Sequence, residues 1–552
     1  MTKLWLISIS LTFFAVLPAA CLAAPPEVNF VFPAGVQRGA TAAVTANGRF
    51  DAWPVRIWVE QDGLNFKPLA EKGKLEVQAD ANARPGLYWI RFYDNSGSAA
   101  LKPFLVGNLP ELLEQEPNDD PRSPQRLNQP ATTINGVLSR SGDVDGFAVR
   151  LRRGQTLVAS VEANRRLGSP MDGVLQVVSE DGFVLAQNDD APHLDPELVF
   201  HPPADGIYIV RLFAFPATPN SSIGFSGGDR FVYRLTLATS GFVHHTLPLA
   251  VADGDVRRLE LVGWNIERPA RFLNVHPIEA TDDGSGGPSL LTVHRPDLAN
   301  TVQVRVESHE TMLEAEPNED GEAQAIRVPT TITGRINVPG DADVYEFAVE
   351  KDERLRVTVE SRSLGFLLDP ALRLADAEGK RLAEADDVDR NNRDATLVHA
   401  FPQGGRYQVE VRDANRFGGV RYAYRLRVVP VDADFKAKLS AERFTLSLGQ
   451  PLEIPVTIEP LDGFSGEVTV AAVDLPQGVA ADPVNVTVKS GGKNGGAVKA
   501  TLRLARDAQA KSGPFRIVAR TTAGRMISRS ATALIPGFAT ATTSVWLTVE
   551  TK

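Results

Sequence analysis

Glu114-Gln115-Glu116-Pro117-Asn118-Asp119 recurs 200 residues later as Glu314-Ala315-Glu316-Pro317-Asn318-Glu319. Each copy is followed by a second acidic motif, which reads Gly142-Asp143-Val144-Asp145-Gly146-Phe147 and then Gly340-Asp341-Ala342-Asp343-Val344-Tyr345. Carboxylate and amide oxygens of this kind are the ligands that hard cations prefer. The paired motifs therefore predict a duplicated domain with a cation site in each copy.

The self-similarity extends well beyond these motifs. The offset between the copies is 198 at Asp145 and Asp343 and 199 at Tyr208 and Tyr407, a drift that short loop insertions between matching strands would produce. Both copies end alike, in Phe231-Val232-Tyr233-Arg234-Leu235-Thr236-Leu237 and Tyr422-Ala423-Tyr424-Arg425-Leu426-Arg427-Val428. Repetition on this scale predicts two copies of a whole domain and not a short-period solenoid.

Short segments that alternate apolar and polar residues make up nearly the whole chain. Val55-Arg56-Ile57-Trp58-Val59 and Arg354-Leu355-Arg356-Val357-Thr358-Val359 are typical, with Gly, Pro, Asn and Asp between such segments. The period of two is that of half-buried strands, and turn signals every eight to twelve residues are typical of sandwiches. We predict an all-β, multidomain chain of β-sandwiches.

The 552 residues exceed what one core can hold, and we expect five domains after a signal peptide. Pro85-Gly86-Leu87-Tyr88-Trp89-Ile90-Arg91-Phe92 and Gly463-Phe464-Ser465-Gly466-Glu467-Val468-Thr469-Val470 lie in segments that resemble bacterial immunoglobulin-like modules. The predicted order is a signal peptide at 1–23, an Ig-like sandwich at 25–108, a first repeat at 112–239, a small β domain at 241–310, a second repeat at 313–430 and an Ig-like sandwich at 432–552.

The N-terminus has the pattern of a secretory signal. Met1-Thr2-Lys3 precedes an apolar run from Leu4 to Leu17, and small residues allow cleavage after Ala23. A lipoprotein signal, acylated at Cys21, is the alternative. Cys21 is the single cysteine, so a chain cleaved after Ala23 would have no disulfide, thiolate metal site or cysteine nucleophile.

Charge and hydropathy restrict the partners. A net charge of −10 and a pI near 5.5 argue against nucleic acid and anionic lipid. Beyond residue 24 no apolar run is long enough to span a membrane. We therefore expect a secreted protein, periplasmic, cell-surface or extracellular, with no transmembrane segment in the mature chain.

The ordered motifs of each copy resemble the bacterial pre-peptidase C-terminal domain, a family that includes the collagen-binding domains of secreted collagenases. The resemblance rests on both acidic motifs, on Asp172 or Asp369 in a following strand, and on Gly-x-Tyr at 206–208 or 405–407. It covers both repeats in tandem. It implies a jelly-roll-like sandwich whose N-terminal segment is held to the sheet by calcium.

The resemblance also implies a ligand set for one Ca²⁺ per repeat. The first site would use Glu114, Glu116, Asn118, Asp119, Asp143 and Asp145, and the second would use Glu314, Glu316, Asn318, Glu319, Asp341 and Asp343. Physical chemistry agrees, because carboxylates this dense repel one another unless a cation intervenes. Calcium is favoured over magnesium, since the oxygens are many and flexibly placed.

Other interpretations of the acidic residues remain open. An acidic Pro-Asn turn can simply solvate an interdomain linker, although its matched recurrence favours ion binding. Weaker acidic clusters surround Asp195 and Asp394. Asp387-Val388-Asp389 begins like an EF-hand loop, but Asn392 replaces the turn glycine, so a polar hairpin tip is the preferred interpretation.

Catalytic motifs are incomplete. Asp283-Gly284-Ser285-Gly286-Gly287-Pro288 transposes the Gly and Asp found around the nucleophile of chymotrypsin-like proteases, in a segment too short for two barrels. His309-Glu310 lacks the second histidine of a zinc-protease helix, and His244, His245, His276 and His294 show no ligand spacing. We expect no enzyme.

The leading functional hypothesis is a secreted, non-catalytic, calcium-stabilised binding or scaffold protein that engages an extracellular protein or polymer, as in adhesion. Tandem domains raise the avidity for a polymeric ligand when both can engage it. The alternative is an accessory or targeting subunit of a separately encoded secreted peptidase or other hydrolase, because the resembled family commonly accompanies peptidase domains.

Overall fold

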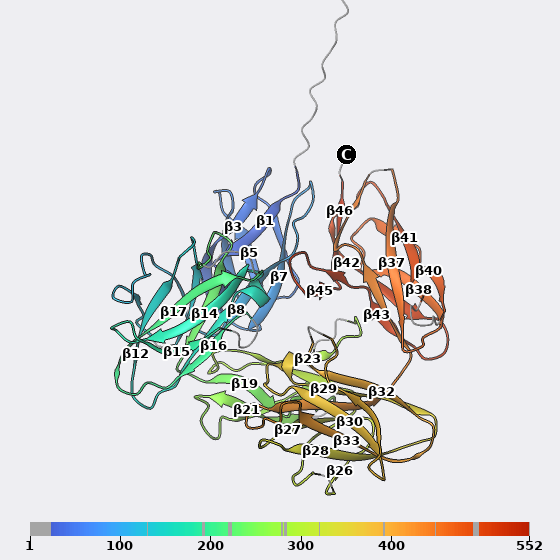
Figure 1. Cartoon of the computed structure of the whole chain (residues 1–552). Helices are drawn as coiled ribbons and strands as arrows, with labels where there is room; N and C mark the ends of the chain where they lie inside the picture. The colour runs from blue at the N-terminus through green and yellow to red at the C-terminus, as the bar shows by residue number, and fades with distance from the viewer. Residues whose placement is uncertain are drawn as a thin grey trace, which may run out of the picture.

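The all-β prediction is confirmed (Figure 1). This computed structural model describes residues 24–550 except 130, 190–193, 219–223, 255, 278–279, 281–283, 320, 390–391, 448 and 490–495. The predicted signal peptide, with Cys21, lies outside the described residues. Within them, no helix is long and apolar enough to cross a membrane.

The N-terminal sandwich consists of two sheets around one apolar core. In sheet order, the first contains β1 (Glu27–Phe32), β3 (Thr41–Arg49), β6 (Lys74–Ala79) and β5 (Leu64–Pro68). The second contains β2 (Gly35–Gln37), β8 (Lys102–Gly107), β7 (Gly86–Tyr93) and β4 (Arg56–Val59). Strand β2 pairs in parallel with β8, which joins the start and the end of this sandwich.

The first repeat is a pair of five-stranded sheets. One sheet has the order β9 (Glu111–Leu113), β11 (Thr132–Val137), β18 (Val232–Ala238), β13 (Leu157–Glu162) and β16 (Glu197–Phe200). The other has the order β10 (Gln125–Arg126), β12 (Asp145–Leu151), β17 (Gly206–Pro216), β14 (Met171–Val178) and β15 (Val184–Asn188). A short helix, α1 (Asn164–Leu167), follows β13.

The second repeat has the same strand order, element for element. Its first sheet contains β25 (Glu310–Leu313), β27 (Thr330–Arg335), β34 (Ala423–Pro430), β29 (Glu353–Glu360) and β32 (Ala395–Phe401). Its second contains β26 (Gln324–Ala325), β28 (Ala342–Val349), β33 (Gly405–Asp413), β30 (Pro370–Asp376) and β31 (Arg381–Ala385). A 3₁₀ turn, η2 (Arg362–Leu364), takes the place of α1.

Register and core agree between the repeats as well. The β14–β15 ladder shifts register after Val177, and the β30–β31 ladder shifts after Leu374. Tyr233 and Tyr424 occupy matching positions in β18 and β34 and are fully buried. The alternating apolar residues of the sequence thus become the inner faces of two equivalent sandwiches, because successive side chains of a strand point to opposite faces.

The segment between the repeats is a shorter version of the N-terminal sandwich, a likeness that the sequence reading missed. Its sheets have the orders β19 (Phe242–Leu247), β21 (Arg257–Trp264), β22 (Phe272–Val275) and β20 (Ala250–Ala252), β24 (Val302–Glu307), β23 (Ser289–Val293). As in the N-terminal sandwich, the second strand pairs in parallel with the last. Gly48 and Gly263 correspond, because each packs against the backbone of the first strand, where a Cβ would clash.

The C-terminal sandwich completes the chain. One sheet contains β35 (Asp434–Leu439), β37 (Leu452–Leu461), β41 (Val498–Arg506) and β39 (Val479–Ala481). The other contains β36 (Arg443–Leu446), β46 (Val545–Val549), β42 (Gly513–Thr521), β38 (Gly466–Val473) and β40 (Val484–Val488), with β43 (Ser528–Ser530) added to β42. A two-stranded ribbon joins β44 (Ala533–Leu534) to β45 (Ala541–Thr542).

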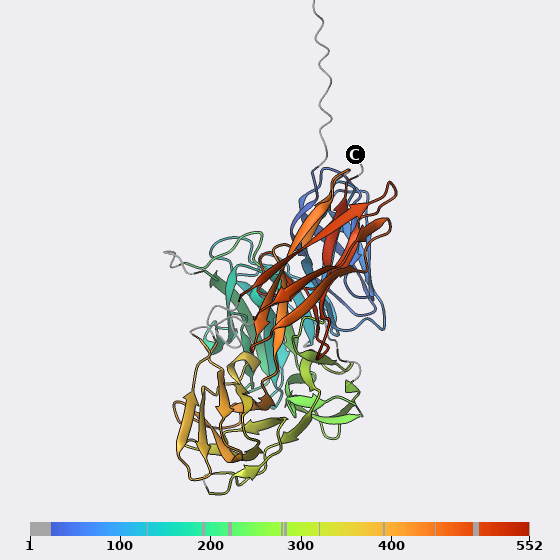
Figure 2. The same ribbon diagram turned by 90° about the vertical axis from the view of Figure 1, so that its right-hand side faces the viewer.

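The first and last sandwiches pack against each other, which closes the chain of sandwiches on itself (Figures 1 and 2). Arg91 and Glu442, 351 residues apart, form an ion pair in which both side chains are buried. The guanidinium of Arg91 lies over the Trp546 ring, and Trp89 contacts Phe538 edge to face at 5.0 Å. Buried charges need such partners, so this contact fixes the relative position of the two sandwiches.

Candidate cation sites and an interdomain pocket

Parallel strand pairing brings the first acidic residue of each repeat onto the sheet. β9 runs parallel to β11, and β25 runs parallel to β27, so the chain enters each motif along a sheet edge. The Glu114 carboxylate then accepts a hydrogen bond from the Val137 N–H at 2.8 Å. The Glu314 carboxylate accepts from the Arg335 N–H at 2.7 Å. The two linkers therefore hold their glutamates in the same way.

A buried tyrosine forms hydrogen bonds with acidic residues of each site. The Tyr233 hydroxyl lies 2.9 Å from Glu114 Oε2 and 2.5 Å from Asp145 Oδ2. In the second repeat, the Tyr424 hydroxyl donates to Asp343 and lies 2.6 Å from the Tyr345 hydroxyl. Tyrosine in this strand thus positions the second aspartate of the Asp-x-Asp motif.

Two glycines make room for this arrangement. A Cβ at Gly136 would lie 2.2 Å from Glu114 Oε2, and one at Gly334 would lie 2.6 Å from Glu314 Oε2 and 2.3 Å from the Tyr424 ring. The glutamate and the tyrosine both pack onto the bare backbone of the strand. Only glycine permits so close an approach.

Burial, together with neighbouring negative charge, raises the pKa values of the acidic side chains. Burial, reinforced by the Glu114 charge, raises the pKa of Asp145 to about 10. Burial raises the pKa of Asp343 to about 8 and that of Glu314 to about 7, and neighbouring carboxylates add to both shifts. In the absence of a cation, burial therefore shifts these groups toward their protonated forms.

The structure brings together some of the predicted ligands but not all of them. Carboxylate oxygens of Glu116, Asp119 and Asp143 lie within 4.8 Å of one another in the first repeat, and those of Glu314, Glu316 and Asp343 do so in the second. Asp341 accepts instead from the N–H groups of Asn337 and Ala342. Glu319 is exposed and takes no part in the second cluster.

The two asparagines are fully buried and use different atoms. Asn118 Oδ1 accepts from the Gly146 N–H at 3.2 Å, which leaves its buried Nδ2 without a partner among the described residues. The side-chain oxygen of Asn318 faces Glu316 Oε2 and Asp343 Oδ1, at 3.1 and 3.3 Å. Three oxygens so placed repel one another unless a cation lies between them or the amide is turned over to donate from nitrogen.

A cationic side chain distinguishes the two sites. Arg140 donates to Asp143 Oδ1 at 2.9 Å and to Asp119 Oδ2 at 2.5 Å, so a guanidinium bridges the first cluster. The corresponding residue of the second repeat is Val338, which is 60% exposed. Arg335 lies near the second cluster, where its charge offsets part of the rise in the Glu314 pKa that burial causes. Its guanidinium donates to Asn337 and forms no described ion pair with a carboxylate of this cluster.

The weaker acidic motifs have structural roles. Asp195 accepts from the Asn164 and Arg165 N–H groups at the start of α1, and Asp394 accepts from the Ser361 and Ser363 N–H groups before η2. Both carboxylates satisfy backbone donors that a helix start leaves open. Asp389 pairs with Asn392 at a hairpin tip, as the preferred interpretation of the EF-hand-like stretch predicts.

The catalytic near-misses remain ordinary surface and core features where they are described. Ser285 Oγ accepts from the Gly287 N–H in a turn, and Asp283 lies outside the described residues. His309 Nε2 contacts the Thr331 hydroxyl at 2.9 Å. No group of three His, Cys, Asp or Glu residues with metal-site spacing includes a histidine in the described part of the chain.

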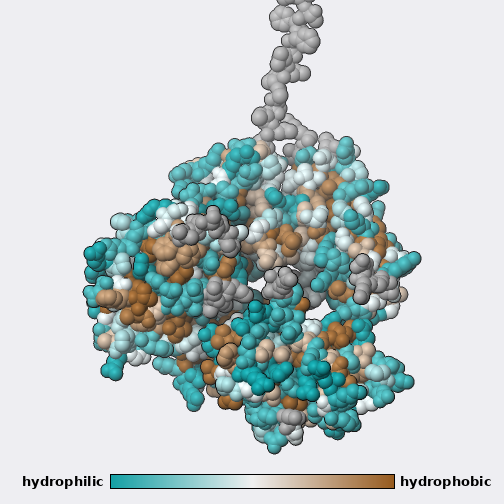
Figure 3. All heavy atoms as spheres, in the orientation of Figure 1, coloured by the Kyte–Doolittle hydropathy of each residue, from teal (hydrophilic) through white to brown (hydrophobic). Residues whose placement is uncertain are grey.

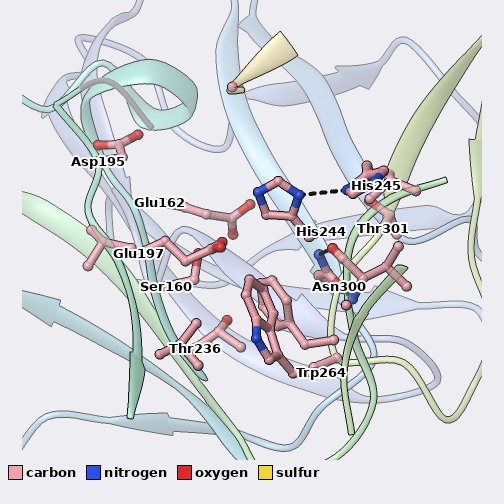
Figure 4. Close-up of a pocket in the computed structure, with 18 of the residues that line it drawn as sticks. Ser160, Glu162, Asp195, Glu197, Thr236, His244, His245, Trp264, Asn300 and Thr301 are labelled. Carbon is pink, nitrogen blue, oxygen red and sulfur yellow. Dashed lines mark hydrogen bonds between the residues drawn. The ribbon is translucent and has the colours of Figure 1, made fainter. Parts of the chain in front are cut away.

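His244 and His245 lie in the wall of a cavity of about 880 Å³ (Figure 4). Their Nδ1 atoms are joined by a 2.8 Å hydrogen bond. Burial lowers the pKa of His244 to about 4 and that of His245 to about 3, so both rings are neutral. We call this cavity the interdomain pocket, because residues of the N-terminal sandwich, both repeats and the middle sandwich line it.

Comparison with known proteins gives partial likenesses. No family profile matches the chain. A probable subtilase-type serine protease of Deinococcus radiodurans is 31% identical over 98 residues, which is 18% of this chain and 14% of the protease. The chain thus matches only a small part of that relative's length.

Solved structures include several β-rich neighbours. The pre-peptidase C-terminal domain of a Bacillus anthracis collagenase is 22% identical and matches over 21% of this chain and 99% of that domain, with a TM-score of 0.17. A Bacteroides ovatus mixed-linkage glucan utilization protein is 11% identical over 73% of this chain and 72% of its own, with a TM-score of 0.14. Native alpha-2-macroglobulin of Escherichia coli is 12% identical over 98% of this chain and 47% of its own, with a TM-score of 0.16. TM-scores this low carry no argument about function.

Proposed function

We propose that the protein is a secreted, non-catalytic binding or scaffold protein whose two repeats are each stabilised by a calcium ion. Two observations support the proposal. The N-terminus has the pattern of a secretory signal, and each of the two equivalent sandwiches brings carboxylates together at matching loops. Pre-peptidase C-terminal domains are binding modules in the family that the motifs resemble. Calcium is the preferred ion because it accepts several carboxylate, amide and carbonyl oxygens in flexible geometry.

One observation carries the ion assignment. In the second repeat, carboxylate oxygens of Glu314, Glu316 and Asp343 lie within 4.8 Å of one another. Glu314 and Asp343 are buried enough that their charges cost free energy without a partner. A divalent cation would neutralise all three carboxylates at once.

Thermal unfolding with and without chelator tests this proposal. A ligand present at 100 times its dissociation constant stabilises the folded state by about 2.7 kcal/mol per site. Removal of calcium should lower the melting temperature, and the Asp143→Asn, Asp343→Asn double variant, which removes one carboxylate from each cluster, should show no such difference. Equal melting of the wild type with calcium and with chelator would reject the ion assignment.

The first repeat also offers a surface for a partner. Phe213, Phe215 and Phe225 form a cluster, in which Phe213 stacks on Phe225 at 4.3 Å and Phe215 and Phe225 are more than a third exposed. Figure 3 shows hydrophobic residues gathered on the part of the surface that the first repeat forms. Exposed aromatic clusters are typical of interaction sites. The register places Arg412 of β33 where β17 has Phe213, so the second repeat lacks this cluster.

The alternative function is an accessory subunit of a separately encoded secreted peptidase. The partial match to a subtilase-type protease favours it, because the matched segment belongs to a protein that carries a peptidase. Affinity capture decides between the two. The immobilised mature chain is loaded with a secretome in calcium and eluted with chelator; a recovered peptidase supports the subunit, and a recovered matrix or envelope component supports the scaffold.

A further inference from the structure

The interdomain pocket is walled by parts of the chain that are far apart in sequence. Ser160, Glu162 and Glu197 come from the first repeat, and His244, Trp264 and Asn300 come from the middle sandwich (Figure 4). Phe366 of the second repeat contacts both histidine rings, at 5.7 and 5.0 Å. None of the predicted calcium ligands lines the pocket. It is therefore a site distinct from both cation sites.

Four charged residues of the pocket walls, Glu162, Arg166, Arg234 and Arg425, are already paired. Glu162 accepts from Arg166 at 2.6 Å and from Arg234 at 2.8 Å, and Arg234 also pairs with Glu111. Arg425 pairs with Glu360 at 2.8 Å. Asp195 caps α1 as described above. Because these ion pairs neutralise the interior walls, an ion is not needed to balance them.

Several polar atoms of the walls still have hydrogen-bonding capacity. The Glu197 carboxyl has Ser160 as its hydrogen-bonding neighbour. Since the two Nδ1 atoms of the histidine pair bond to each other, one Nε2 is an acceptor and the other is an N–H donor. A ligand in this pocket must therefore both donate and accept.

Aromatic rings stand beside these polar groups. Trp264 is only half-buried, and its ring meets His244 edge to face at 5.6 Å. In Figure 4 the carboxyl groups of Glu162 and Glu197 point toward His244 and Trp264 across the cavity. An indole face suits an apolar ring surface, while the surrounding polar atoms suit a rim of hydroxyl groups.

We propose that the interdomain pocket binds a neutral oligosaccharide. A pyranose ring has an apolar C–H face that packs on Trp264, and its hydroxyls can donate to Glu197 and accept from a histidine N–H. The volume of about 880 Å³ lies in the range of ligand pockets and exceeds what a single sugar ring fills. The cation sites and this pocket share no residue, so the proposed calcium dependence and this binding can fail separately.

The test uses the full mature chain. A fluorescently labelled sample is applied to an array of neutral and acidic glycans, and the strongest neutral oligosaccharide is then titrated calorimetrically into wild type, Trp264→Ala, Trp264→Phe and Glu197→Gln. Glu384→Gln, an exposed carboxyl outside the pocket, is the matched control. Melting temperatures confirm that each variant is folded.

The proposal expects a neutral glycan to bind, with affinity reduced about tenfold or more by Trp264→Ala, reduced less by Trp264→Phe, and unchanged by Glu384→Gln. Glu197→Gln keeps the shape but loses acceptor strength and should also weaken binding. Any of three results would overturn the proposal. The first is no binding of a neutral glycan below millimolar concentration, and the second is equal binding by wild type and the Trp264→Ala variant. The third is a preference for acidic glycans, which would point to binding by Arg165 and Arg421 at the exposed rim.

Discussion

Exchanging Arg140 and Val338 between the repeats should reverse the relative calcium affinities of the two sites. Arg140 bridges two carboxylates of the first cluster, whereas the corresponding Val338 contributes no charge to the second. A guanidinium already bound to ligand oxygens both competes for them and repels an incoming cation. We therefore expect the wild-type second site to bind calcium more tightly than the first.

The contacts set the size of the effect. The guanidinium donates to Asp143 at 2.9 Å, and calcium binds carboxylate oxygens at about 2.3 to 2.6 Å, so the two positive groups would stand roughly 5 Å apart. With water and salt screening at this exposed position, a unit charge at that distance from a divalent ion changes the dissociation constant by roughly tenfold. Competition for the two oxygens adds to this factor.

Calorimetric calcium titration measures each site separately when the other is silenced. Arg140→Val is made in an Asp343→Asn background and should strengthen the first site by about tenfold. Val338→Arg is made in an Asp143→Asn background and should weaken the second site by a similar factor. If neither substitution changes its site's affinity by more than about twofold, the guanidinium does not act as a counter-ion and the argument is wrong.

Three further outcomes follow from the structure. Gly334→Ala should lower the calcium affinity and the melting temperature, because its Cβ would clash with Tyr424 and Glu314. Gly496→Ala is the control: a Cβ there meets no atom within 4 Å, so both quantities, measured by calorimetry, should stay unchanged. Burial raises the pKa of Glu197 to about 7, so the folded state keeps a proton that the unfolded chain releases, and stability falls as pH rises from about 4.5 to 7. Glu197→Gln should remove a loss of about 3 kcal/mol, seen as a melting difference at pH 8 that vanishes at pH 4. Arg91→Met removes the buried partner of Glu442 and leaves it only Arg443, at 3.0 Å. The cost should therefore stay below the roughly 3 to 5 kcal/mol of a wholly unpaired buried charge, and the radius of gyration in solution scattering should increase. Arg503→Met, which breaks an exposed pair, should change neither.

The sequence was sufficient for the fold class and for the location of the candidate cation sites. Period-two alternation survives in the sheets because burial on one face is a local pattern that each strand carries by itself. Both acidic motifs are short and recur, so the loops that converge in the structure could be recognised without coordinates. The order of strands within each repeat, by contrast, depends on long-range pairing that no local pattern encodes.

The supporting residues and the pocket could not be predicted in the same way. Tyr233 and Gly136 act through contacts with residues about a hundred positions away, although the recurrence of both in the second copy was a usable signal. Arg140 could have been noticed by aligning the copies, where it stands against Val338. The interdomain pocket depends on how four sandwiches pack, and such packing is decided by scattered side chains without a sequence period.

The central claim is that each repeat holds one calcium ion, and a calorimetric titration of the metal-stripped, full mature chain with calcium, in excess magnesium, tests it most directly. The account predicts two bound calcium ions per chain with unequal affinities, falling to one in the Asp343→Asn variant, which loses the tighter site. The absence of binding heat up to millimolar calcium, or an unchanged stoichiometry in that variant, would contradict it.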